Sequence, residues 1–551
     1  VLLFFVAETP KGNFDNLLRW LAYGSFFVML VWLRRYKHFD QFLPYLFQLS
    51  GIILVIFSLF GIWGWIEYKD LLLGERLTGP FQYANTFAAV IGAYWLYSLV
   101  QLTISRRHFI VNLLFSFPLV PYGVSFFHTY SRGAVLVFAV VWFLGLLVLQ
   151  FKHQILYVLS TAISVGGSLL VFSHFIKQEQ SGIHLPGLWP VLIGTGVICG
   201  ICVLLSWDWI KSWFSKWTER STFSKYGHFG MPIVMLIIGA LLLLDISNQG
   251  WVYRLLPTSL QQRIDDINLE TTSVVGRTGM FEDALEISKH SPIFGFGGEG
   301  WRIVYHQYQS RPYYSNEVHN GYLEILLNTG WIGLALFTAV VIYLLAEMLR
   351  NLKRQEKETL SVGIAASITA LSMLLVHAFV DFDFSYGSVW LIIFWLIAMS
   401  IPYDQVTFGL KVSLFKHYKR LPLAFNIVGR SVLTLFILAG MIFAFRFHSA
   451  ESQIAKANGV PINEGIQLME QSFSLNPYHV DIGLSLANAY LQHYTASKDE
   501  KVKAKLLKTM EKLENLEPRN ARMLYVLGQF HSQLGDWEKT IAYFERALKT
   551  E

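Results

Sequence analysis

Charged residues are scarce in this sequence, and cysteines are scarcer still. Asp, Glu, Lys and Arg make up only 15% of the 551 residues, whereas hydrophobic residues make up 54%. Because soluble domains carry about 25% charged residues, this composition excludes an ordinary water-soluble globular protein. The two cysteines, Cys199 and Cys202, lie in one apolar run. Packing explains such a pair better than a redox couple or a metal site does.

Apolar runs of about 20 residues recur along most of the chain, and each is long enough to cross the hydrocarbon core of a bilayer as a helix. We therefore predict an all-α fold, namely a polytopic helical membrane protein with about twelve transmembrane helices. The predicted spans are 16–33, 44–66, 83–103, 109–127, 132–150, 155–175, 188–206, 231–246, 320–346, 361–380, 386–402 and 428–447.

Positive charge is concentrated in alternate loops between these spans, so the net charge of +6 does not indicate a nucleic-acid partner. Cytoplasmic loops of membrane proteins carry an excess of Lys and Arg. We expect a transmembrane domain over 1–447, with a large extracytoplasmic loop at 247–319, and an extracytoplasmic soluble domain over 448–551. The six basic loops that we assign to the cytoplasm contain Arg34, Arg106, Lys152, Lys211, Arg350 and Lys411.

The segment after residue 448 has the pattern of a soluble helical array. Pro477 and Pro518 lie where a tetratricopeptide repeat, which this segment resembles, ends its second helix. Their separation of 41 exceeds the usual length of about 34, so we expect a short insertion near 493–502. Such an array either offers a docking surface to a peptide or protein or is a helical cap without a partner. The residues expected to pack its last two helices together are Leu527, Gly528, Ala542, Phe544 and Ala547.

The loops that we expect outside hold several arginines near the membrane, among them Arg76, Arg132 and Arg277. The bias of positive charge toward the cytoplasm discourages arginines there. Arginine grips phosphate with a forked pair of donors, so a lipid pyrophosphate is a natural partner. The alternatives are ordinary. In the first alternative, Arg132 only anchors a helix end by extending its side chain toward the membrane–water interface. In the second, Arg76 and Arg277 form ordinary salt bridges with Glu75 and Glu282.

A histidine opens the ninth span in "VHNGYLEILLNTG", residues 318–330. We expect His319 at a helix N-terminus on the outer face, where a positive potential attracts anions and where histidine can act as a general base near neutral pH. The alternative is a helix cap or an interface residue. The glycines of "FGFGGEG" (294–300) predict a tight turn, because the Lys-Ser/Thr of a phosphate loop does not follow them.

An acidic pair lies on the same expected outer side, in "VDFDF" at 380–384. An Asp-x-Asp pair such as Asp381 and Asp383 holds a metal–diphosphate in some glycosyltransferases. Here, however, no other carboxylate or histidine is close in sequence to the pair. We expect a carboxylate that orients His or Arg side chains, and no metal.

Together, these residues resemble the O-antigen ligase and polymerase superfamily of bacterial envelope glycosyltransferases over roughly residues 40–400. The most specific mark is the pattern His-Asn/Ser-x-x-Leu-x6-Gly, which His319, Asn320, Leu323 and Gly330 match. The stretches "RLTGPFQYANTFA", "SRGA" and "GR…PIFGFGGEGW" occur in the matching order.

This resemblance implies transfer of a glycan from an undecaprenyl-pyrophosphate lipid to an acceptor hydroxyl at the outer face of the bacterial cytoplasmic membrane. The reaction would be inverting and would use no nucleotide sugar, cofactor or metal. The resemblance implies that His319 is catalytic. The other implied residues are Arg132, Arg277 and Arg76, which would bind the donor pyrophosphate, and Asn320, Asp381 and Asp383, which would support them.

Two other functions are compatible with a membrane chain of this size. A flippase or transporter for lipid-linked glycans would show charged or broken helices at mid-membrane, and a repeat scaffold would use its spans only as an anchor. The polar features gather at the outer rim, which favours an enzyme. Ligase, polymerase and protein O-glycosylation stay open, as do the sugar, the acceptor and the oligomeric state. We expect truncation near residue 450 to spare transfer to simple acceptors.

Overall fold

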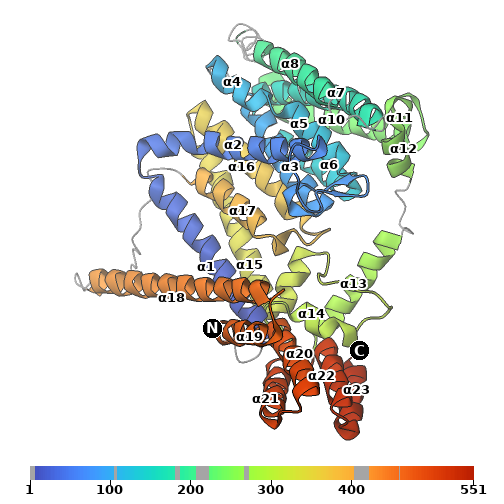
Figure 1. The fold of residues 1–551 in the computed structure, drawn as a ribbon. Helices are drawn as coiled ribbons and strands as arrows, with labels where there is room; N and C mark the ends of the chain where they lie inside the picture. Colours follow the sequence, from blue (N-terminus) through green and yellow to red (C-terminus); the bar gives the residue numbers. More distant parts are fainter. Residues whose placement is uncertain are drawn as a thin grey trace. The chain divides into compact units, whose positions relative to one another are not determined.

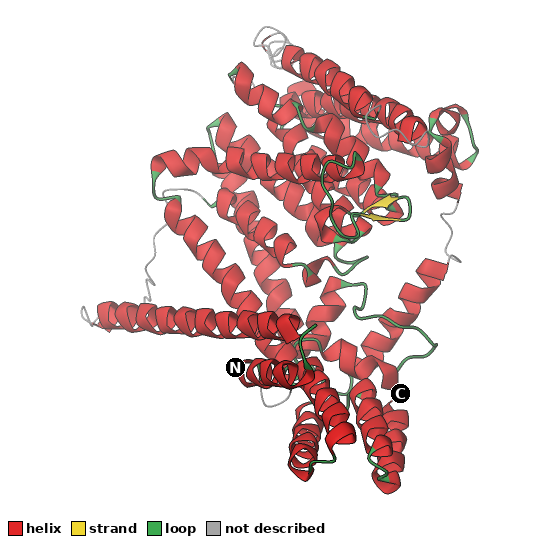
Figure 2. Cartoon of the chain, viewed as in Figure 1, coloured by secondary structure: helices red, strands yellow, loops and turns green. Residues whose placement is uncertain are grey.

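The computed structural model describes most of the chain, and in the described part nearly all regular structure is helical (Figures 1 and 2). The prediction of an all-α fold is confirmed. One small hairpin, β1 (Leu72–Leu73) with β2 (Arg76–Leu77), is the only sheet in this part, and it turns at Gly74 with φ of +59°. The described residues are 7–104, 108–179, 187–205, 212, 223–265, 272–401, 421–457 and 459–550.

A helix or helix pair lies over each of the twelve predicted spans. Among the described residues, nine segments are long and apolar enough to cross a membrane, and α4 and α5 together make one of them. The remaining predictions correspond to α3, which has 18 residues, and to α6 and α17, which are apolar but shorter. The helices are α1 (Pro10–Leu33), α2 (Lys37–Ile62), α3 (Ala84–Gln101), α4 (Phe109–Ser116), α5 (Leu119–His128), α6 (Arg132–Val148), α7 (Phe151–Glu179), α8 (Leu188–Leu205), α10 (Phe223–Ser247), α15 (Gly321–Arg354), α16 (Glu358–His377), α17 (Gly387–Ser400) and α18 (Leu421–Ala457).

The ninth predicted span is wrong in one respect, because α15 is not one straight helix. Gly330 has φ of +70° and ψ of −177°, which breaks the helical backbone there. Only glycine adopts such a conformation at low cost. Leu327, in the part before the break, is buried in the core of the preceding loop. The first turns of α15 therefore belong to that loop.

The described chain divides into two compact units by its internal contacts. The first contains residues 1–26, 276–338 and 407–551, and the second contains 27–275 and 339–406. This grouping differs from a division at residue 447, because it places the tail with the loop that carries His319. That the tail is an extracytoplasmic domain stays a prediction.

In the second unit, α3 is buried along nearly its whole length and packs against α16, α5 and α6. Small residues allow this close approach: a Cβ built on Gly92 would lie 3.0 Å from Met373 and 3.3 Å from Phe126. Trp95 is buried and donates from its indole nitrogen to the Ser164 hydroxyl at 2.7 Å. These contacts hold the middle of α3 in the core of the second unit.

The tail is an array of helices that pack as neighbours in sequence, α18 with α19, α20 with α21 and α22 with α23. Leu527 and Ala547 are buried in its core, and Gly528 leaves room for Phe544, whose ring would lie 2.6 Å from an added Cβ. The expectation for Ala542 is wrong: Ala542 is exposed, because the next residue turns toward the core instead. The assignment to tetratricopeptide repeats stays a prediction. The tail helices are α19 (Ile462–Leu475), α20 (Val480–Ser497), α21 (Glu500–Leu516), α22 (Ala521–Gln533) and α23 (Trp537–Thr550).

Candidate functional site

In the first unit, a loop with its own apolar core precedes α15. Trp301, Tyr305 and Tyr313 stack in this core, with neighbouring ring centroids 5.0 and 5.6 Å apart. Asp283 is buried and accepts hydrogen bonds from the Tyr313 hydroxyl at 2.7 Å and from the backbone N–H of Ser310 at 3.1 Å. Burial, together with this bond to a carboxylate, raises the pKa of Tyr313. The loop is therefore tied to α13. Its short helices are α13 (Thr272–Ser288), α14 (Gly300–Val304) and η3 (Tyr305–Gln307).

His319 lies at the start of α15 in an unusual backbone conformation. Its φ is +43°, in the left-handed region that histidine, asparagine and aspartate enter more readily than other non-glycine residues. Val318 before it is fully buried. Asn320 after it caps the helix, since its side-chain oxygen accepts the N–H groups of Tyr322 at 3.0 Å and Leu323 at 3.1 Å. The half-buried His319 is thus held from both sides by its chain neighbours.

The glycine-rich segment forms a tight turn, as expected. Gly295 and Gly297 have φ of +69° and +80°. The N–H groups of Phe296 and Gly297 donate to the carbonyls of Leu327 at 2.7 Å and Asn328 at 3.2 Å. The turn therefore packs along the first part of α15, whose N-terminal end carries the candidate histidine.

Arg277 lies on α13 and is half-buried. It is in the same unit as His319. It lies six residues before Asp283, the aspartate that ties the loop to this helix. A Cβ built on Gly279, two residues further on, would lie 4.0 Å from the Ser310 hydroxyl. The N-terminal half of α13 therefore lies next to the loop that leads to the histidine.

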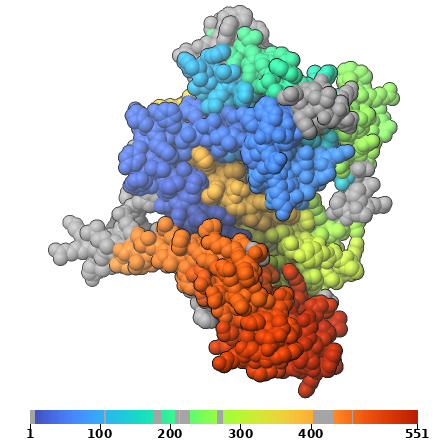
Figure 3. Space-filling view, in the orientation of Figure 1, coloured from blue at the N-terminus to red at the C-terminus, as the bar shows by residue number. Residues whose placement is uncertain are grey.

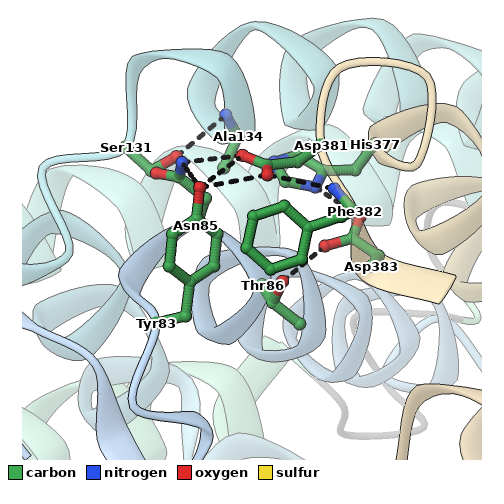
Figure 4. Close-up of polar contacts among 9 residues, drawn as sticks. All are labelled: Tyr83, Asn85, Thr86, Ser131, Ala134, His377, Asp381, Phe382 and Asp383. Atoms are coloured by element: carbon green, nitrogen blue, oxygen red, sulfur yellow. Dashed lines mark hydrogen bonds and ion pairs between the residues drawn. The ribbon is translucent and has the colours of Figure 1, made fainter. Parts of the chain in front are cut away.

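In the second unit, a chain of hydrogen bonds begins at Arg76. Figure 4 shows the part of this chain that joins Tyr83 and Asn85 to Asp381. The Nε of Arg76 donates to the carbonyl of Thr129 at 2.9 Å, and its Nη2 donates to the Asn85 side-chain oxygen at 2.6 Å. Asn85 in turn donates to Asp381 at 2.7 Å, and the Tyr83 hydroxyl donates to the same carboxylate at 3.0 Å. Asp381 is buried. The Asp381 carboxylate therefore holds the Asn85 amide, and the amide in turn fixes the plane of the Arg76 guanidinium.

The second aspartate has different partners. Asp383 is fully buried, and its two oxygens accept from the Thr86 hydroxyl and contact Nδ1 of His377, at 2.7 and 2.6 Å. His377 ends α16, and Asp383 opens η4 (Asp383–Ser385). Each aspartate therefore has protein partners of its own. Among the described residues, no group of three or more His, Cys, Asp or Glu side chains is placed to hold a metal ion.

Arg132 is the first residue of α6, and Ser131 caps that helix by accepting the Ala134 N–H at 3.4 Å. Arg132 lies three residues after Thr129, and the carbonyl of Thr129 accepts the hydrogen bond from the Arg76 guanidinium. A Cβ on Gly133 would lie 3.8 Å from Val380. The second unit therefore brings this helix start close to the acidic segment.

Sequence reasoning missed four members of these networks: Tyr83, Asn85, Thr86 and His377. The first three lie inside the quoted stretch "RLTGPFQYANTFA". Their position directly before and within the first turn of a buried helix was the signal available. His377 gave no such signal, because its partner lies six residues away across a helix end.

The comparison with protein families agrees with the helical membrane fold. The class is that of a polytopic helical membrane protein with a polar site. Within it, residues 117–338 match a family model described as O-antigen ligase. This match covers less than half of the chain, and it confirms the resemblance to the O-antigen ligase and polymerase superfamily. No curated protein matches the chain.

The match has consequences for the site and for the function. Arg132, Arg277 and His319 lie inside the matched residues, whereas Arg76, Asp381 and the tail lie outside them. At the level that the family supports, the protein has an O-antigen ligase-like role in polysaccharide biosynthesis. At the same coarse level it is a glycosyltransferase-like membrane enzyme, and the family implies a lipid-linked glycan as the partner.

Proposed function

We propose that the protein transfers a glycan from an undecaprenyl-pyrophosphate lipid to an acceptor hydroxyl at the outer face of the cytoplasmic membrane. The observation that carries this proposal is His319, which is set in a left-handed conformation before the capped first turn of α15, inside the family match. The excess of Lys and Arg in alternate loops supports the outward orientation of this residue.

In the proposed reaction, the acceptor hydroxyl attacks the anomeric carbon of the first sugar. His319 takes the hydroxyl proton, the new glycosidic bond forms, and the bond from the anomeric carbon to the pyrophosphate oxygen breaks. The electron pair leaves with the polyprenyl pyrophosphate, and in-line attack inverts the anomeric centre. A general base of this kind contributes a factor of about 10²–10⁴ to the rate.

The arginines are proposed to bind the donor and offset the charge that grows on the departing pyrophosphate. Arg277 and Arg132 carry this role. Arg76 donates to Asn85 and to a backbone carbonyl, so its orientation is set by the protein. Asp381, which accepts a hydrogen bond from Asn85, is a positioning residue in this scheme.

The test is release of polyprenyl pyrophosphate by purified protein given a polyprenyl-pyrophosphate-linked glycan and a simple sugar acceptor. We expect release and glycan transfer in equal amounts, and loss of both in His319→Ala. His290→Ala is the matched control, since this exposed histidine lies in the same unit. A flippase or a scaffold would leave the lipid-linked glycan intact, and that result would overturn the proposal.

A further inference from the structure

The tail contacts the amino-terminal segment of the chain, within the first unit. Arg519 pairs with Glu8 at 3.0 Å. Glu517 is only 2% exposed, and its carboxylate accepts hydrogen bonds from the Thr9 hydroxyl and, at 2.7 Å, from the Asn520 amide. A buried carboxylate is costly unless such donors satisfy it. The contact is therefore a specific one, made by the turn between α21 and α22.

The same amino-terminal segment, residues 8–12, also contacts the glycine-rich turn. The Glu8 N–H donates to the Phe296 carbonyl at 3.0 Å. Gly12 and Gly298 touch so closely that a Cβ built on Gly12 would lie 2.5 Å from the Gly298 carbonyl oxygen. A side chain at either position would push the two segments apart.

The glycine-rich turn is in turn bonded to the helix of the candidate base. Phe296 and Gly297 donate to the carbonyls of Leu327 and Asn328, which belong to the first part of α15. These contacts thus run without a gap from the tail, through residues 8–12 and 295–298, to the helix that begins after His319. A second contact joins α23 to η3 of the same loop, and in the space-filling view the tail and the loop border each other (Figure 3).

We propose that the tail positions α15, the helix that begins directly after His319, with Glu517 and Arg519 holding residues 8–12 against the glycine-rich turn. The catalytic consequence rests on the proposed function, whereas the mechanical connection does not. This proposal departs from the expectation that truncation near residue 450 spares transfer. It also means that whatever binds the tail acts on the same structure that sets the histidine.

The first experiment compares Gly12→Ala with Gly24→Ala in the full chain. Both glycines lie in α1, but a Cβ on Gly24 would meet nothing within 4 Å. We expect Gly12→Ala to speed amide hydrogen exchange at least about tenfold in residues 292–300 and 321–330, and Gly24→Ala to leave it unchanged. Unchanged exchange in Gly12→Ala would overturn the mechanical connection.

The second experiment asks whether the connection serves catalysis. Glu517→Ala removes the acceptor that binds Thr9, whereas Glu517→Gln keeps a side-chain oxygen there. We expect Glu517→Ala to raise exchange in the same peptides and to lower kcat several-fold with little change in KM for the lipid donor, and Glu517→Gln to restore most of the rate. Raised exchange with normal kcat would overturn the positioning of His319.

These outcomes separate two kinds of failure. If the wild-type protein transfers no glycan from a polyprenyl-pyrophosphate donor, the proposed function fails, while the exchange comparison still decides the mechanical connection. If transfer occurs and a variant truncated after residue 457 keeps the full rate and normal exchange, the proposed role of the tail is wrong. Thermal unfolding of each variant identifies protein that has not folded.

Discussion

The two units place their candidate residues by different means. Around Asp381, side chains hold side chains: a buried carboxylate holds an amide, and the amide holds Arg76. Around His319, the backbone sets the position of the residue, through its positive φ and through the helix cap that Asn320 forms. A side-chain network depends on each of its members, whereas a backbone-set residue depends on the turn that contains it. The predictions below test this difference.

The largest effect is expected at His319 itself, where Asn is the informative substitution. Asparagine tolerates the left-handed region but is no base, so His319→Asn should keep the backbone and lose the chemistry. We expect turnover to fall by about 10²–10⁴-fold with unchanged thermal unfolding. Initial rates over a range of donor concentrations, with the anomeric product identified by NMR, provide the measurement. Near-normal turnover would reduce the histidine to a turn residue.

Arg277→Lys comes next. The substitution keeps the charge but loses the forked pair of donors that matches a phosphate. We expect a loss of about 10–100-fold in kcat/KM, divided between donor binding and rate, which corresponds to about 1.4–2.8 kcal/mol. Arg311→Lys, at an exposed position of the same loop, is the control. Equal behaviour of the two variants would exclude a donor-binding role for Arg277.

Asp381→Asn should break the side-chain network. The amide presents N–H groups where the carboxylate accepted hydrogen bonds from Tyr83 and Asn85, so at least one half-buried donor loses its acceptor. We expect a cost of about 1–3 kcal/mol in stability and a loss of activity near tenfold. Thermal unfolding and rates on the same preparation measure both. If stability falls while the rate does not, the network that includes Arg76 is only structural.

The backbone-set region is tested by Gly330→Ala against Gly64→Ala. Both glycines have φ near +70°, so alanine is strained in both. Only at Gly330 would the new Cβ meet the backbone at Ile293, whereas nothing lies within 4 Å at Gly64. We expect about 1 kcal/mol at Gly64 and about 2 kcal/mol more at Gly330, seen in thermal unfolding. Equal losses of stability in the two variants would mean that the segment at Ile293 shifts easily to make room for the new Cβ.

The smallest effect is expected from pH. Burial raises the pKa of Glu517, and Glu299 raises it further, while bonds from Thr9 and Asn520 and the charge of Arg302 lower it. Because the folded pKa lies above the ordinary 4.5, the folded protein binds more protons between the two values, so its stability falls as the pH rises through the folded pKa.

Mild acidification from neutral pH should therefore stabilise the contact of the tail with residues 8–12. The measurement is the shift in the unfolding temperature with pH for the wild type minus that for Glu517→Gln, which cannot titrate there. A difference of the opposite sign, with stability lost on acidification, would show that hydrogen bonds to the charged form dominate this site.

The membrane helices could be predicted from sequence because apolar runs of bilayer length need no tertiary information. The break at Gly330 could not, since a glycine inside such a run reads as helix until the segment packed on it is known. The position of His319 directly before a helix could also be predicted, because a helix start is a local sequence pattern. The link from Arg76 to Asp381 was missed because 296 residues separate Asn85 from the carboxylate, and no periodicity connects them.

The left-handed backbone at residue 319 also bears on how such an enzyme can change. The fold accepts few residues there, and asparagine and aspartate are among them. In the genetic code, one nucleotide change converts a histidine codon into a codon for either. The shortest evolutionary step away from this chemistry therefore preserves the architecture. Under the proposed function, it would leave a folded membrane protein that still binds the proposed lipid-linked donor but no longer transfers its glycan.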